Sequence, residues 1–136
     1  MSPYGSRARY VNDSIATASP SRLLTMLYDR LVLDLARAEE AQRAKDRSQA
    51  NACLVHAQAI ILELKSSLKV DAWDGGPALA SIYTFVYSEL VAANVQNDPK
   101  RTAVCRELVE PLRDAWHEAA RTAGASGAAR LVATPA

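Results

Sequence analysis

Three prolines divide this chain into segments of helix length, and this division limits the folds that it can adopt. Each proline directly follows a residue that commonly precedes a helix. The three pairs are Ser19-Pro20, Gly76-Pro77 and Asp98-Pro99. Proline suits the first helical turn because its missing N–H would have no partner there. The side chains of Ser19 and Asp98 can also accept hydrogen bonds from the free N–H groups of that turn.

A further helix start near Asp46 or Ser48 brings the predicted number of helices to four. The predicted helices cover approximately residues 20–44, 48–70, 77–97 and 99–121. Within each segment apolar residues recur at spacings of three and four, which places them on one face of a helix. In the second segment they are Leu54, Ala57, Ile61, Leu64 and Leu68. In the fourth they are Val104, Leu108, Leu112, Ala115 and Ala119.

Short connections between these segments make consecutive helices antiparallel. The predicted fold is therefore all-α, an antiparallel up-down-up-down four-helix bundle, which buries all four apolar stripes. Pro111 lies inside the fourth segment and is expected to kink it. We expect the bundle to span residues 19–121.

The two ends of the chain lack this pattern. Residues 1–18 contain few residues at core spacing, and we expect a short arm or helix that lies on the bundle. Residues 122–136 are small, glycine-rich and aperiodic, and we expect a disordered tail.

Charge and composition exclude several functions. With 16 basic and 15 acidic residues, the chain lacks the basic excess that nucleic-acid binding requires. Two cysteines and two histidines fit neither a disulfide framework nor a metal site, and no residue pattern indicates catalysis or a cofactor.

The first 20 residues contain Arg7, Arg9 and Asp13 but no apolar run, so we expect no signal peptide and a cytoplasmic protein. The third segment approaches membrane-spanning length, but its polar residues make insertion into a membrane costly.

The second and third segments carry too little charge for helices that are half exposed. Between Ala50 and Leu62 there is no formally charged side chain, apart from a possible charge on His56. Between Pro77 and Asn97 the only formally charged side chain is that of Glu89. Each segment has a second stripe beside its core stripe. These stripes are Asn51, Val55, Gln58 and Leu62, and Tyr83, Tyr87, Leu90 and Asn94. Such a mixture of apolar, amide and tyrosine side chains is typical of a groove that binds a partner helix or an extended peptide.

Two other interpretations of these stripes stay open. The tyrosines could pack against a connecting loop while the amides stay in water. Alternatively, the uncharged helices could bury each other in a homodimer, which would make the chain a self-associating structural bundle.

Ordered motifs along the chain resemble those of one known family. The first is Tyr10 followed by Ile15 and Thr17-Ala18-Ser19-Pro20, and the next comprises Leu23, Met26, Leu27, Tyr28 and Asp29. The second helix matches at Asn51, Leu54, Ala57, Gln58, Ile60, Ile61, Glu63, Leu64, Ser67 and Leu68. Later matches are Leu90, Ala93, Asn94, Asn97 and Asp98, and then Arg113-Asp114-Ala115-Trp116. Across about residues 10–117 the chain resembles the FliS family of flagellar export chaperones. Arg30 in place of the usual glycine, Trp73 and Pro111 depart from the family pattern.

The resemblance implies a function without catalysis or cofactor. A family member binds the disordered C-terminal segment of flagellin, prevents its premature polymerisation and assists its delivery to the flagellar type III export apparatus. Tyr10 and Ile15 would belong to an arm that yields to the client. We expect the partner to contact these two residues, the two uncharged stripes, and Leu54 and Ile61 beside them. The export gate and other flagellar regulators are further expected contacts, and the expected state is a monomer or weak homodimer. The alternative is a self-associating structural bundle without a flagellin client.

Overall fold

A computed structural model describes residues 20–133, including the side chains of residues 21–123, and this part is helical with short connections. In chain order the elements are α2 (Pro20–Arg43), α3 (Arg47–Ser67), the short 3-10 helix η1 (Val70–Ala72), α4 (Gly76–Gln96) and α5 (Pro99–Ala133). The predicted all-α class and the packing of four helices as a bundle are confirmed. Ser19, the arm and residues 134–136 lie outside the described residues.

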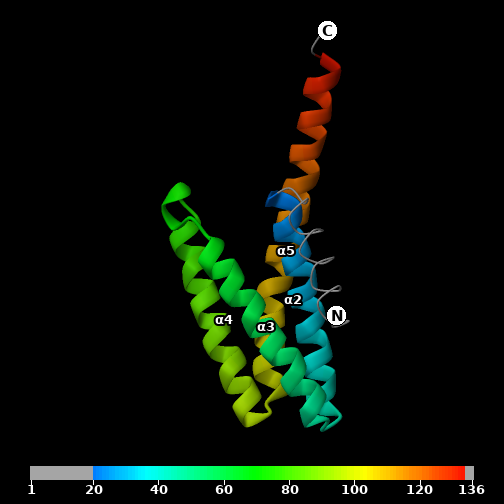
Figure 1. The fold of residues 1–136 in the computed structure, drawn as a ribbon, viewed down its shortest axis with the longest axis vertical. Helices are drawn as coiled ribbons and strands as arrows, with labels where there is room; N and C mark the ends of the chain where they lie inside the picture. The colour runs from blue at the N-terminus through cyan, green and yellow to red at the C-terminus, as the bar shows by residue number, and fades with distance from the viewer. Residues whose placement is uncertain (1–19, 134–136) are drawn as a thin grey trace, which may run out of the picture.

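Helix α2 packs against α3 and α5, and α4 completes the bundle by packing against the same two helices and η1 (Figure 1). Consecutive helices run antiparallel, as their short connections predict. In Figure 1 helix α4 forms one edge of the bundle, and the end of α5 extends well beyond the other helices.

Local capping chemistry accounts for the helix boundaries. The Asp46 side chain accepts a hydrogen bond from the backbone N–H of Gln49 at 3.1 Å and so caps the start of α3. Pro77 occupies the first turn of α4, as predicted. Helix α4 ends where Asn97 takes a left-handed conformation with φ of 51°, which asparagine tolerates better than most residues.

The core lies where the stripes of α2, α3 and α4 meet. Tyr28, Leu31, Leu35, Leu54, Ile61, Val86 and Leu90 are among its fully buried side chains. Most residues that were predicted to form the core-facing stripe of α5 do not face the core. Val104, Leu108, Ala115 and Ala119 are exposed, and Thr102, Cys105 and Val109 face the core instead. Apolar residues are adjacent along α5, so spacing alone did not identify the core face.

The C-terminal part of α5 also differs from expectation. The helix includes Pro111 and continues to Ala133, whereas a disordered tail was expected from residue 122. Alanine, which has the highest helix propensity, is frequent in this stretch and favours its continuation as helix despite two glycines.

A buried polar contact joins three helices near one end of the bundle. The Gln42 side chain of α2 donates to the carbonyl of Ala93 in α4 at 3.1 Å. It also accepts a hydrogen bond from the Thr102 hydroxyl of α5 at 2.7 Å. Because buried polar groups need partners, this arrangement fixes the three helices in register at that end.

Candidate partner-binding surface

The exposed part of the two uncharged stripes lies on neighbouring helices, α3 and α4. The Asn94 amide of α4 donates to the Asn51 side-chain oxygen of α3 at 2.8 Å. Since α3 and α4 are antiparallel neighbours, this contact fixes their register at this point. Val55 is 50% exposed and Leu62 is 48% exposed, while Gln58, Tyr87 and Asn94 are half-buried.

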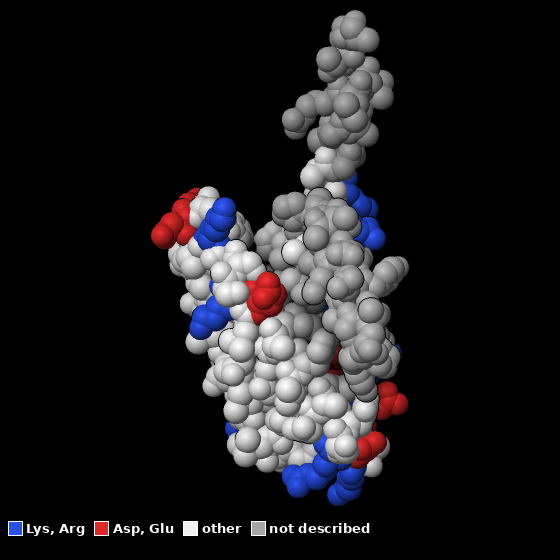
Figure 2. All heavy atoms as spheres, in the orientation of Figure 1, with Lys and Arg blue, Asp and Glu red and all other residues white. Residues whose placement is uncertain are grey.

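We call this surface the α3–α4 flank. It comprises Asn51, Val55, Gln58 and Leu62 of α3 and Thr84, Tyr87, Val91 and Asn94 of α4. Its residues carry no formal charge. Figure 2 shows a largely white face where α3 and α4 lie in Figure 1, with isolated charged residues on it. A contiguous uncharged surface of this kind typically marks a site of protein–protein contact.

Four of the predicted partner-binding residues lie in the core. Leu54, Ile61 and Leu90 are fully buried and Tyr83 is 2% exposed. Tyr83 faces inward because its hydroxyl is hydrogen-bonded to that of Tyr28 at 2.7 Å. Burial removes these four side chains from the flank and leaves them supporting it from beneath. Tyr10 and Ile15 lie outside the described residues.

Helix α4 carries three of the exposed large apolar side chains, Phe85, Val91 and Val95. Among the described helices it alone is long and apolar enough to cross a membrane, judged by length and composition only. The core helix of a soluble protein passes the same test, but only 28% of the most apolar window of α4 is buried. The fold therefore leaves much of this helix free to contact another chain. Sequence analysis did not predict its exposed residue Phe85, nor Val104 and Leu108 on α5.

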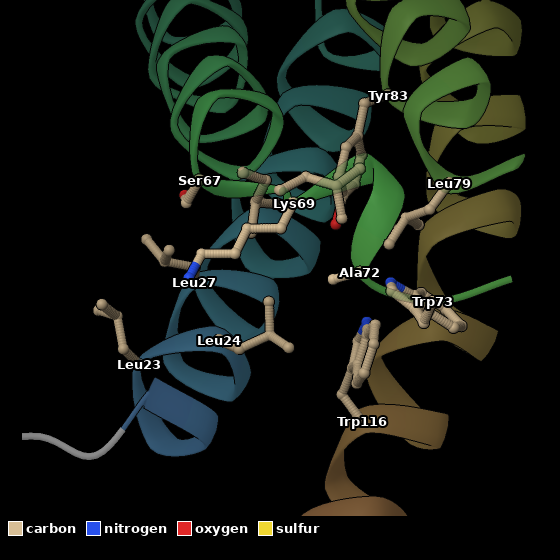
Figure 3. Close-up of a pocket in the computed structure, with 12 residues that line it drawn as sticks. Leu23, Leu24, Leu27, Ser67, Lys69, Ala72, Trp73, Leu79, Tyr83 and Trp116 are labelled. Carbon is tan, nitrogen blue, oxygen red and sulfur yellow. The ribbon is translucent and has the colours of Figure 1, made fainter. Parts of the chain in front are cut away.

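An apolar pocket opens near the end of the bundle where α2 begins and α3 ends (Figure 3). Its cavity volume is about 310 Å³. The first turns of α2, the end of α3, η1 and α4 contribute its aliphatic walls, and Trp73 and Trp116 stand on one side. The two indole rings meet edge to face at a centroid distance of 6.2 Å. Sequence analysis missed this pocket, since the only signal in the sequence was the unusual Trp73.

Two glycines hold Trp73 in this position. A Cβ at Gly75 would lie 2.1 Å from the Trp73 ring, and one at Gly76 would lie 2.0 Å from the carbonyl oxygen of Val70. The loop before α4 can therefore fold this closely only with glycine at both positions.

The reactive side chains show no sign of activation. Burial raises the pKa of the Cys105 thiol to about 12 and also raises the pKa of Cys53. Both thiols therefore stay protonated and poorly nucleophilic at neutral pH. His56 pairs with the buried Asp34, and His117 Nε2 lies 2.6 Å from Asp29. The described residues contain no group of three or more His, Cys, Asp or Glu side chains that could hold a metal ion.

A helical bundle with an uncharged flank and an apolar end pocket belongs to the class of proteins that bind another polypeptide. The sequence comparisons identify the family. The family model described as "Flagellar protein FliS" matches residues 3–123, and the chain belongs to the FliS family of flagellar secretion chaperones. The chaperone family agrees with the prediction that the chain is not an enzyme.

Individual relatives agree with this assignment. The flagellar secretion chaperone FliS of Bacillus subtilis is 33% identical over 110 residues, covering 81% of this chain and 82% of the relative. That of Campylobacter jejuni is 30% identical over 112 residues, covering 80% and 86%. A crystal structure of a bacterial flagellar chaperone superposes with a TM-score of 0.69 at 19% identity, covering 89% of this chain and 99% of that one. At this identity the structural match supports the fold alone.

Proposed function

We propose that this chain is a cytoplasmic export chaperone for flagellin. It binds the disordered C-terminal segment of flagellin, prevents premature polymerisation and assists delivery to the flagellar type III export apparatus. The α3–α4 flank carries this proposal. Its two stripes, joined by the Asn51–Asn94 hydrogen bond, form one uncharged surface with exposed valine and leucine side chains.

The chemistry of the flank suits a client that is disordered before binding. Val55, Leu62 and Val91 offer apolar area to one face of a helix or extended segment. The amides of Gln58 and Asn94 can pair with client groups at the edge of the contact. Ordering the client costs roughly 2–5 kcal/mol or more, which burial of apolar surface offsets.

The N-terminal arm has a regulatory role in this proposal. Tyr10 and Ile15 lie on residues 1–18, which directly precede α2. The motif containing these residues resembles the family pattern, and the resemblance supports an arm that covers part of the client site and yields when the client binds. Contact with the export gate would follow once the client is bound.

Single substitutions on the flank test the proposal. Gln58→Arg and Tyr87→Glu each place a charge on the uncharged surface. Because Tyr87 packs partly against the core, circular dichroism must show that its variant keeps the fold. Each should weaken binding of a flagellin C-terminal peptide by roughly tenfold or more, measured by calorimetry on the full chain. Ala36→Arg, at an exposed position on α2, is the matched control and should bind normally. Normal binding by both folded flank variants would place the client elsewhere.

Self-association is the second candidate, favoured by the exposed Phe85, Val91 and Val95 of α4. Two copies could bury these residues against each other in a symmetric dimer. Sedimentation without client distinguishes the two functions, since a tight dimer that does not bind the peptide would support the structural role.

A further inference from the structure

Helix α4 is apolar on several sides, so its own apolar pattern does not determine which side faces the core. Val86 and Leu90 are fully buried, yet Phe85, Val91 and Val95 are large apolar side chains exposed on other sides of the helix. Turning α4 by ~100° about its axis, the angle between successive residues, would exchange Leu90 for Val91 in the core. One apolar residue would replace another inside, but part of the α3–α4 flank would be buried. Interactions other than apolar burial must therefore fix the rotation of α4.

Two buried hydrogen bonds connect α4 to α2 across the core. These helices lie on opposite sides of the bundle, since each packs against α3 and α5 (Figure 1). The hydroxyls of Tyr28 and Tyr83 are hydrogen-bonded at 2.7 Å. The Gln42 side-chain amide donates to the Ala93 carbonyl at 3.1 Å. Tyr83 is 2% exposed and Gln42 is 3% exposed, so both bonds are shielded from water, where losing a partner is costly for a polar group.

The positions of these two bonds suit them to fix both the rotation and the height of α4. Residues 83 and 93 are ~15 Å apart along the helix axis. Tyr87 and Val91 of the flank lie between them in the sequence, and Asn94 directly follows Ala93. A turn or a shift of α4 by one residue would separate Tyr83 from Tyr28 and the Ala93 carbonyl from Gln42 at the same time.

Gln42 is itself held in one orientation. The Thr102 hydroxyl of α5 donates to its side-chain oxygen at 2.7 Å, which directs the amide nitrogen toward α4. An ion pair between Glu89 and Arg101 also joins α4 to α5 at 2.8 Å. The Arg101 side chain is 37% exposed, and partly exposed ion pairs contribute little. The two buried hydrogen bonds from α2 are therefore the stronger constraint on α4.

From these contacts we infer that Tyr28 and Gln42 are positioning residues for partner binding. Neither residue belongs to the α3–α4 flank. They hold α4 in the one rotation that presents Tyr87, Val91 and Asn94 beside α3. The effect on the flagellin segment rests on the proposed function, whereas the rotation of α4 can be measured without any client.

Gln42→Met separates positioning from stability. Methionine fills a similar volume but has no amide. The Ala93 carbonyl keeps the backbone N–H of Asp98 at 3.0 Å, and the Thr102 hydroxyl can turn to a carbonyl of its own helix. No buried polar group is left unpaired, so the urea unfolding midpoint should stay close to that of the unaltered chain. Tyr83→Phe tests the second bond, because it keeps the ring and removes one hydroxyl.

Amide hydrogen exchange, followed by mass spectrometry on the full chain, reports the effect on α4. Each variant should speed exchange in α4 by roughly three- to tenfold while α3 changes less. Each should also weaken binding of a flagellin C-terminal peptide by roughly three- to tenfold, measured by calorimetry. The double variant should show a larger effect on both.

Thr25→Val is the matched control. Thr25 is also a buried polar residue of α2, but its hydroxyl donates to the Arg22 carbonyl of the same helix at 2.9 Å. This substitution should change neither the exchange of α4 nor the affinity for the peptide.

The outcomes separate this inference from the proposed function. Unaltered exchange in α4 and normal affinity in both variants would overturn the inference, while the chaperone function stands. Exchange that speeds up equally in all helices, with a lower unfolding midpoint, would show a general structural role and would also overturn it. Failure of the peptide to bind the unaltered chain would overturn the proposed function and the role in client binding. Exchange in α4 would then still decide whether these residues fix its rotation.

Discussion

Ile61 and Leu62 are neighbours in the sequence with opposite environments. Ile61 is fully buried, whereas Leu62 is 48% exposed on the α3–α4 flank. This difference in burial shows how well the environment of a single residue could be predicted from the sequence. The three-four spacing identified the buried face of α3 correctly. It did not place Tyr83 inside, because the Tyr28–Tyr83 hydrogen bond depends on two helices that are far apart in the sequence.

Aspartate at these two positions should therefore have different effects. Ile61→Asp buries an unpaired carboxylate and should lower the free energy of unfolding by more than about 3 kcal/mol. Leu62→Asp should cost less than about 1 kcal/mol of stability but weaken binding of the flagellin peptide. Urea unfolding and calorimetry measure the two effects. Equal loss of stability in both variants would contradict the assigned burial.

The Cys105 thiol gives the bundle a predicted sensitivity to alkali. Burial raises its pKa from an ordinary value of 9.0 to about 12. The folded state thus keeps a proton that the unfolded state loses, so stability is complete below pH 9 and falls as the pH rises toward 12. The slope is at most about 1.4 kcal/mol per pH unit for this group.

Urea unfolding at pH 8, 9 and 10 measures this slope. Cys105→Ala should remove most of it between pH 9 and 10. Cys53→Ala should remove less of it, because Cys53 is less buried than Cys105, although burial raises the pKa of both thiols. An unchanged slope in the Cys105 variant would assign the sensitivity to other groups.

At the scale of elements, helix starts were more predictable than helix ends or helix faces. Asp46, Pro77 and Pro99 act on the backbone next to them, so their sequence signals were sufficient to locate three helix starts. Helix α5 has adjacent apolar residues at Val104 and Cys105 and again at Leu108 and Val109. Its core face depends on how it packs against α2 and α4, which the spacing within α5 does not determine.

The cap of α3 offers a test at this scale. Asp46→Ala removes the acceptor for the Gln49 backbone N–H and should lower the free energy of unfolding by about 1 kcal/mol. Asp46→Ser supplies another acceptor and should restore most of the loss. Thermal unfolding followed by circular dichroism measures both changes, and an equal loss in the serine variant would exclude capping as the cause.

At the scale of the whole molecule, the sequence predicted the bundle and one flank but not the end pocket. The flank lies on two consecutive helices whose missing charge is visible in the sequence. The pocket requires residues from α2, α3, η1, α4 and α5, together with a loop folded closely around two glycines. No local pattern indicates that Trp73 and Trp116 meet.

The central claim is that this bundle binds and orders the C-terminal segment of flagellin. The most direct test is calorimetric titration of the full chain with that segment from the same cell, at several temperatures, with circular dichroism of the complex. We predict tight one-to-one binding, a negative heat-capacity change from apolar burial, and a gain of helix. A folded chain that does not bind the segment would contradict the claim.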